Sequence, residues 1–101
     1  MDFTWGKIMK NTILVNGKRK TCRIYDMGES MADRYTVAFR GYRVRGRMVY
    51  PYLACDANPF HPMGFGQHGE SNIFISGREI GKRVTFDAMS DQVKRFILDN
   101  I

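Results

Sequence analysis

Long hydrophobic runs are absent from this sequence of 101 residues. Its apolar stretches are short, as at residues 13–15 and 74–75, whereas a helix that crosses a bilayer needs roughly 18 apolar residues. We also expect no secretory signal, because Lys7 and Lys10 interrupt the one candidate apolar core of such a signal. The sequence therefore predicts a cytoplasmic protein with no membrane partner.

Cysteine and acidic residues are scarce as well. Without a secretory signal, Cys22 and Cys55 are predicted to be reduced thiols rather than a disulfide. A hydrophobic content of 44% excludes a disordered chain, and the length allows one domain with one modest core. We assign residues 10–101 to that domain and residues 1–9, which contain the isolated Trp5, to a peripheral extension.

Positive charge is concentrated in one part of the chain. Residues 18–47 hold nine basic and three acidic residues, which accounts for the whole net charge of +6. The other seventy-one residues carry seven bases and seven acids. We therefore expect an anion-binding surface built from two neighbouring segments rather than spread over the protein.

Two turn signals predict two β-hairpins. Asn16-Gly17 stands between two β-prone runs, and Asn-Gly is the strongest short-range signal for a type I′ turn. Arg45-Gly46 stands near the centre of residues 34–55, the longest strand pattern in the chain. A second hairpin that turns there would place Val44 opposite Arg47.

That register divides the second hairpin into two faces. The face predicted to lie in the core holds Tyr35, Val37, Phe39, Met48, Tyr50 and Tyr52. The opposite face holds Arg40, Tyr42, Val44, Arg47, Val49 and Leu53. Its cations gather towards the tip, as expected of a ribbon that projects past the domain. Pro51 cannot donate to a ladder and is expected at an edge or a bulge.

Residues 56–72 match neither the period of a strand nor that of a helix. They contain two prolines, three glycines and both histidines. We predict a long ordered loop that packs down through Phe60, Met63 and Phe65, and loops of this length are usually functional or disordered.

The C-terminal part predicts two short strands and a helix. The strands are expected at residues 73–75 and 83–86, and Ser90 is the expected N-cap of the helix. Helical spacing places four apolar side chains on one face, namely Val93, Phe96, Ile97 and Ile101. Together the patterns predict an α+β fold, a small antiparallel sheet built from β-hairpins with one C-terminal helix packed on it. So small a core would gain from a partner, which makes a homodimer a reasonable expectation.

The basic hairpin at residues 40–47 combines four arginines with Tyr42. Arginine binds phosphate through two parallel hydrogen bonds and tyrosine stacks on bases, so the hairpin suits nucleic acid, a nucleotide or an acidic protein patch. The purely structural alternative is a solvated tip whose charges prevent aggregation.

The histidine loop allows several interpretations. Cys55, Asp56, His61 and His68 are acceptable zinc ligands, but neither Cys-x2-Cys nor His-x3-His spacing occurs, so we predict no metal and no cofactor. The histidines could instead satisfy loop backbone groups, or donate to a phosphate that the loop glycines let approach. A metal-free ribonuclease could be assembled from the two histidines and a cation, with histidine as acid and base, and it is the least unlikely enzymatic activity. No nucleophile motif accompanies them, and the sequence favours a binding protein over an enzyme.

Three strings of the chain resemble a known family. They are DRYTV at residues 33–37, ANPFHPMGFGQHGE at residues 57–70 and IGKRVTF at residues 80–86. Together they resemble a family of short uncharacterised proteins of tailed bacteriophages and prophages, over most of residues 24–98. The resemblance implies the cytoplasm of an infected bacterium and transfers no catalytic residues.

In that context a small binding protein suggests counter-defence. We predict a phage-encoded protein that sequesters a nucleotide-type, phosphate-bearing ligand. The predicted ligand-binding residues are Arg40, Tyr42, Arg43, Arg45, Arg47, His61, Gln67 and His68. The alternatives are nucleic-acid binding through the hairpin at residues 40–47 and inhibition of a host defence protein.

Overall fold

The computed structural model describes residues 11–15, 17–75 and 81–101. The expected boundary between residues 1–9 and the domain, together with Trp5, lies outside the described residues. Described elements follow the order β1 (Asn11–Val15), β2 (Lys18–Asp26), β3 (Tyr35–Phe39), β4 (Tyr42–Val44), β5 (Arg47–Cys55), β6 (Gly66–Ser71), β7 (Lys82–Val84), the 3-10 helix η1 (Phe86–Ala88) and α3 (Asp91–Asp99).

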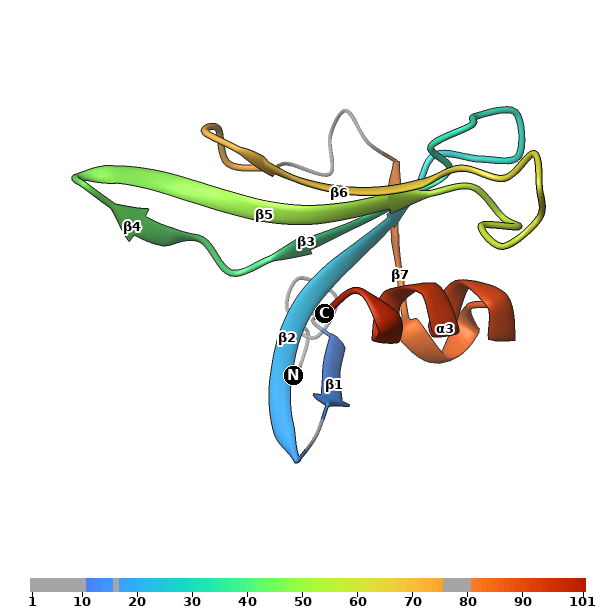
Figure 1. The fold of residues 1–101 in the computed structure, drawn as a ribbon, viewed down its shortest axis with the longest axis horizontal. Helices are drawn as coiled ribbons and strands as arrows, with labels where there is room; N and C mark the ends of the chain where they lie inside the picture. The colour runs from blue at the N-terminus through green and yellow to red at the C-terminus, as the bar shows by residue number, and fades with distance from the viewer. Residues whose placement is uncertain (1–10, 16, 76–80) are drawn as a thin grey trace, which may run out of the picture.

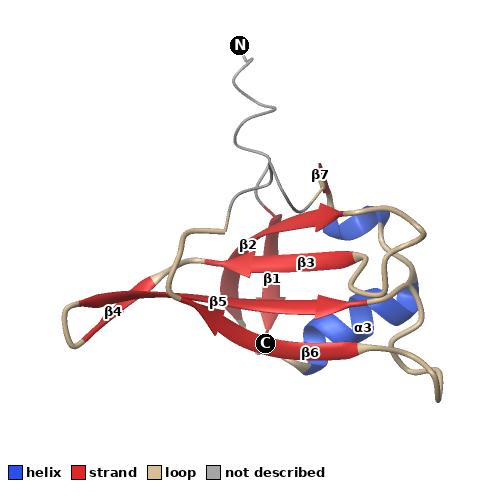
Figure 2. Ribbon diagram, turned by 90° about the horizontal axis from the view of Figure 1, so that it is seen from above, coloured by secondary structure: helices blue, strands red, loops and turns tan. Residues whose placement is uncertain are grey.

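These strands form one antiparallel sheet with a helix against one face. The strand order is β1-β2-β3-β5-β4, with β6 on the other edge of β5 and β7 on β2. Figures 1 and 2 show α3 lying against the sheet near the end of β5 and the start of β6. The α+β prediction is confirmed, with the helix at the C-terminal end of the chain. Among the described residues, no helix has the length and apolarity that a membrane crossing requires.

Both predicted hairpins form at the predicted turns. Val15 pairs with Lys18 across the first turn, where Gly17 has a φ of 78°. Val44 pairs with Arg47 across the second turn. Arg45 and Gly46 take φ values of 50° and 82°, the two positive values that a type I′ turn requires. This turn geometry matches the twist of the flanking strands and keeps each hairpin narrow.

A bulge between β3 and β4 overturns part of the predicted register. Tyr42 pairs with Val49, but Ala38 pairs with Tyr52, so residues 39–41 span the same length of ladder as Tyr50 and Pro51. The extra residue shifts β3 by one position along β5, and a shift of one exchanges the two faces. Pro51 lies opposite this interruption, as predicted.

The sheet face towards α3 therefore differs from the predicted core face. Tyr35 and Val37 are buried there as expected, but Leu53 and Cys55 accompany them. Tyr50 and Tyr52 alternate with Leu53 along β5 and lie on the opposite face, where they are half-buried. The core is completed by buried side chains of the other elements, namely Ile13, Cys22, Ile24, Met89, Val93, Phe96 and Ile97.

The C-terminal helix begins as its sequence predicts. Ser90 Oγ accepts a hydrogen bond from the Val93 N–H at 3.3 Å, which caps the first turn. Val93, Phe96 and Ile97 are buried against the sheet, and each contributes about 1.5–3 kcal/mol by leaving water. Gly66 makes room for this packing, because a Cβ at that position would lie 2.5 Å from the Phe96 ring.

Three local predictions between β5 and β7 are wrong. Residues 66–71 form β6 instead of continuing the loop. They pair with the edge of β5 through backbone hydrogen bonds, which do not require the alternation of apolar and polar side chains on which the prediction depended. Residues 73–75 form no strand, and Ile73 and Phe74 are largely exposed. Phe60 and Met63 do not pack down either, since 50% and 86% of their surfaces remain exposed.

Candidate functional site

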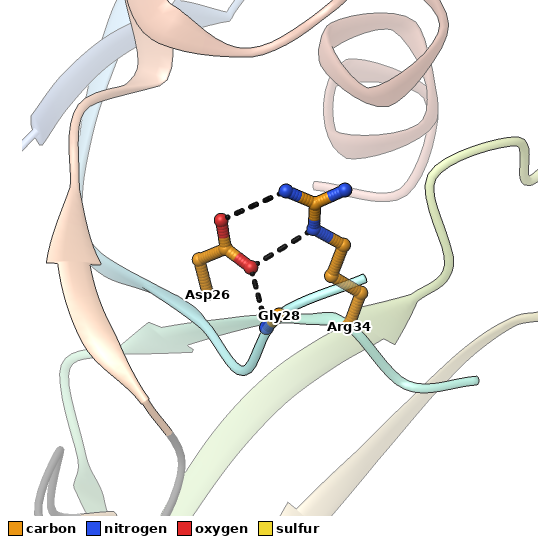
Figure 3. A network of polar contacts seen from close by, with 3 residues as sticks. All are labelled: Asp26, Gly28 and Arg34. Atoms are coloured by element: carbon orange, nitrogen blue, oxygen red, sulfur yellow. Dashed lines mark hydrogen bonds and ion pairs between the residues drawn. The ribbon is translucent and has the colours of Figure 1, made fainter. Parts of the chain in front are cut away.

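Two of the nine bases counted in residues 18–47 are structural. The first is Arg34, whose guanidinium donates to both carboxylate oxygens of Asp26 at 2.9 and 3.2 Å. The same carboxylate accepts the Gly28 N–H at 2.8 Å and so closes the turn between β2 and β3 (Figure 3). The hydrogen bond from Arg34 is the main reason that the pKa of Asp26 lies below its ordinary value.

Arg23 is the second structural base. Its Nη1 donates to the Tyr25 hydroxyl at 2.9 Å and to the Ile75 carbonyl at 2.6 Å. Its guanidinium also lies 4.6 Å from the centre of the Phe74 ring. Arg23 therefore fastens residues 74–75 to the sheet face opposite α3.

The remaining seven bases gather at the two hairpin tips. Lys18, Arg19 and Lys20 occupy the β1–β2 tip, and Arg40, Arg43, Arg45 and Arg47 occupy the β4–β5 tip, all of them exposed. Figure 1 shows the tips pointing in different directions away from the body. The concentration of charge counted in the sequence thus becomes two separate cationic projections.

We call residues 40–49 the arm. It extends beyond the rest of the sheet (Figure 2). The clustering of cations towards the tip of the second hairpin predicted such a projection. Tyr42, Val44, Arg47 and Val49 share its α3-side face through the pairs Tyr42 with Val49 and Val44 with Arg47. Tyr42 and Val44 are 46% and 43% exposed, so this face combines a cation with accessible aromatic and aliphatic surface.

The base of the arm is clamped on both faces. On the α3 side, the Tyr42 hydroxyl donates to Glu70 Oε2 at 2.8 Å, and this bond raises the pKa of Tyr42. On the other side the Tyr50 ring covers Gly41, where a Cβ would lie 2.6 Å from the ring. Tyr50 in turn contacts Phe74 edge to face at 5.7 Å. These contacts hold the arm in one direction relative to the sheet.

At the other end of β5, residues 56–65 form a compact loop. The Asp56 carboxylate accepts the N–H groups of Asn58 and Phe65 at 3.0 and 3.1 Å. Two successive turns follow, closed by His61 N–H to the Asn58 carbonyl at 3.1 Å and Gly64 N–H to the His61 carbonyl at 2.7 Å. A backbone so extensively bonded holds its shape, and the loop presents Phe60 and Met63 to solvent.

His61 lines a cavity of about 370 Å³ between this loop and the start of α3. Its Nδ1 accepts the Met63 N–H at 3.0 Å, so a neutral His61 carries its proton on Nε2. The Arg95 guanidinium lies 5.3 Å from the centre of the Phe60 ring. The lining residues are Asn58, Phe60, His61, Asp91, Gln92 and Arg95. No sequence pattern pointed to Arg95 as a site residue, because it falls on the outer face of the helix.

The structure does not bring the predicted ligand-binding residues together within one chain. Arg47 begins β5 and the histidine loop follows Cys55 at its end, which corresponds to roughly 26 Å of extended strand. Gln67 and His68 lie between these ends, paired with Ala54 and Leu53, and both are exposed. One nucleotide cannot contact the arginines of the arm and His61 of the same chain.

Gln67 lines a second cavity, of about 560 Å³, on the sheet face opposite α3. Tyr52 covers Gly69 at its floor, where a Cβ would lie 2.9 Å from the hydroxyl oxygen. The lining residues are Asp33, Thr36, Tyr52, Ala54, Gln67, Glu70, Ser71, Asn72 and Ile75. This lining holds no base, and Asp33 adds a carboxylate, which disfavours a phosphate there.

The two thiols lie apart from these surfaces, in the core. Cys22 and Cys55 are free and buried, and burial raises their pKa values to about 11 and about 12. Within the described part of the chain, no three His, Cys, Asp or Glu side chains are grouped so that they could hold a metal ion.

Comparisons with known proteins leave the function to be argued from this geometry. No protein-family model matches the chain, and neither the curated proteins nor the solved structures contain a match. The resemblance to phage proteins therefore depends on the three sequence strings alone.

Proposed function

We propose that this protein binds nucleic acid through the arm. The observation that carries the proposal is the arm itself, a projecting hairpin with four exposed arginines and no acidic residue between positions 40 and 47. Phosphate contacts by Lys and Arg supply most of the affinity of sequence-independent binding to nucleic acid. The predicted nucleotide ligand is replaced as the leading candidate because its residues do not converge.

The shape of the arm supports this proposal. A two-stranded β-ribbon fits the major groove of B-form DNA, which is flanked by the two phosphate backbones. The α3-side face would bring Tyr42 and Val44 against sugars or bases while Arg47 contacts phosphate. The clamp at Gly41 and Tyr42 holds the arm ready for binding, so little conformational freedom is lost on association.

The double variant Arg45→Ala with Arg47→Ala tests the proposal. It removes two tip cations and leaves the clamp intact, so we expect affinity for duplex DNA to fall by a factor of about ten or more near 100 mM salt. Fluorescence anisotropy with a labelled duplex measures this loss. The matched control, Lys82→Ala with Arg95→Ala, removes the same charge from exposed positions outside both tips and should change affinity less than threefold. Equal losses in the two variants would contradict a site on the arm.

The cavity beside His61 favours a second candidate, a small phosphate-bearing ligand. Its volume of about 370 Å³ falls within the range of small-molecule sites, and His61 Nε2 and the Arg95 guanidinium are possible donors. Asp91 in the lining opposes an anion, which is why this candidate ranks second. Native mass spectrometry of the purified protein would detect such a ligand, and Arg95→Ala should abolish its retention while leaving DNA affinity unchanged.

A counter-defence role in the bacterial cytoplasm is the remaining part of the proposal, and it comes from the resemblance to phage proteins. Expression of the protein should then raise phage yield on a defended host, and the Arg45→Ala, Arg47→Ala variant should lose that effect together with DNA binding. A variant that lost DNA binding and kept the effect would favour inhibition of a host protein instead.

A further inference from the structure

The outer edge of β6 is open. β6 pairs with β5 along one side, and among the strands that the structure describes none pairs with its other side. Exposed backbone edges are usually guarded by Lys, Pro or a bulge, but β6 reads GQHGES and contains neither residue. The exposure of Gly66, Gln67, His68 and Glu70 agrees with an uncovered edge.

The direction of the free backbone groups follows from the ladder. The Asp56 N–H donates to the Phe65 carbonyl at 3.0 Å, one step beyond the pairing of Cys55 with Gly66. Hydrogen-bonded pairs alternate in an antiparallel ladder. Gln67, Gly69 and Ser71 therefore bond to β5, and the N–H and C=O groups of Gly66, His68 and Glu70 point outward.

Pro51 supports this assignment independently. It stands opposite Glu70 in the ladder, and a residue without an N–H group fits a pair that exchanges no hydrogen bonds. Three outward-pointing residues at every second position make an edge that an antiparallel strand with the same spacing can pair with.

We propose that β6 pairs antiparallel with β6 of a second copy of this chain, about a two-fold axis at His68. Gly66 then pairs with the partner's Glu70, and His68 pairs with the partner's His68. Three hydrogen-bonded pairs form, which supply about six backbone hydrogen bonds across the interface. The dimer joins two sheets into one, with both helices on the same face.

This register forms more backbone hydrogen bonds between the two strands than a register shifted by two residues. Shifting the partner so that His68 pairs with the partner's Glu70 leaves two bonded pairs within the strands instead of three. The proposed register also places each Glu70 side chain opposite the bare Gly66 position, so the two carboxylates do not face one another. Self-complementarity of this kind is what a two-fold interface requires.

The distribution of charge allows a second copy as the occupant, because the two cationic arms lie far from each other in this arrangement. Antiparallel pairing reverses the partner, so the arm of one copy runs beside residues 56–65 of the other, and β5 lies about 10 Å from the partner's β6. The loop end of the partner exposes both Asp91 and Arg95 beside the cavity that His61 lines, so this end carries no excess of positive charge. The two cationic arms do not meet each other, because their tips point to opposite ends of the dimer.

The dimer also completes the site that a single chain leaves divided. Tyr42 and Arg47 lie on the α3-side face of one arm, and the partner's His61 lies on the same side of the joined sheet. The arginines and the histidine loop, about 26 Å apart along β5 of one chain, become neighbours across the interface.

Cysteine cross-linking tests the register, and sedimentation of the full chain tests the association without nucleic acid. In the proposed dimer the Cα atoms of the two His68 residues are about 5.5 Å apart, within reach of a disulfide. The two Gln67 residues are about 8 Å apart, beyond that reach. Cys22 and Cys55 are buried, so they give little background.

We expect the wild-type protein to be a dimer at concentrations of tens of micromolar. We also expect the His68→Cys variant to form an intermolecular disulfide at least tenfold faster than the Gln67→Cys variant. His68→Pro removes one outward N–H without touching the β5 ladder, and it should yield a folded monomer by sedimentation and circular dichroism. A wild-type protein that stays monomeric at 200 µM, or equal cross-linking of the two cysteine variants, would overturn the proposal. Loss of DNA binding alone would leave it standing.

Discussion

The arm and the loop at residues 56–65 occupy opposite ends of the same strand and are built in opposite ways. The arm is a plain hairpin, and at its tip Arg43 Nη1 donates to the Gly46 carbonyl at 3.1 Å. The loop is closed by two successive turns and by the Asp56 carboxylate. Its exposed side chains are aromatic, sulfur-containing and imidazole groups rather than cations.

The difference indicates two kinds of recognition. The electrostatic attraction between a charged ribbon and its partner acts over a distance, depends little on the sequence of the partner and weakens as the salt concentration rises. A loop held by directed hydrogen bonds acts through shape, and a single steric change can destroy it. The two ends should therefore respond differently to substitution, salt and pH.

Two glycine variants should show the largest contrast in stability. A Cβ at Gly64 would lie 2.1 Å from the Asn58 carbonyl oxygen, so Gly64→Ala should lower the free energy of unfolding by about 2–4 kcal/mol. Gly46 has a φ of 82° and no neighbour within 4 Å. Gly46→Ala should therefore cost only about 1–2 kcal/mol. Urea denaturation measures both, and the reverse order would show that the loop is the less rigid end.

Arg34→Gln separates structural arginines from those of the arm. It removes the partner of Asp26 and should lower the free energy of unfolding at pH 7 by about 1–2 kcal/mol, with DNA affinity unchanged. Because the pKa of Asp26 is lowered in the folded state, the pair stabilises the protein above the ordinary carboxyl pKa near 4 and loses this effect as pH falls through the lowered value. The stability difference between wild type and variant should shrink below about pH 4. A difference that stayed constant down to pH 2 would contradict this role.

For the two cysteines buried in the core we expect a smaller effect, on the rate of thiol labelling. With pKa values of about 11 and about 12, Cys22 and Cys55 should be thiolates in fewer than about one molecule in a hundred at pH 8. Labelling by a disulfide reagent should be slow in the folded protein and complete within minutes in urea. Fast labelling of the native state would show that the sheet opens beside β5.

Local signals predicted the elements that local chemistry determines. The turns at Gly17 and Gly46 and the Ser90 cap each depend on a few neighbouring residues, and all three were found from the sequence. The α3 packing face followed from helical spacing. The projection of a cationic hairpin was also predicted from the pattern of residues 40–49.

The sequence-based predictions were wrong where the structure is determined by backbone pairing or by residues distant in the sequence. At the bulge of residues 39–41, Tyr50 of the facing strand packs over Gly41, a contact between strands that no local sequence pattern predicts. β6 is a strand because β5 offers it an edge, although its own sequence has little strand propensity. The separation of the arm from His61 then follows from the length of β5.

The salt dependence of binding to a labelled DNA duplex tests the central claim most directly. If four arginines of the arm contact phosphates, the logarithm of the association constant should fall with the logarithm of salt concentration with a slope of about −4. The Arg45→Ala, Arg47→Ala variant should reduce that slope to about −2. A slope that is near zero, or that is the same in wild type and variant, would contradict nucleic-acid binding by the arm.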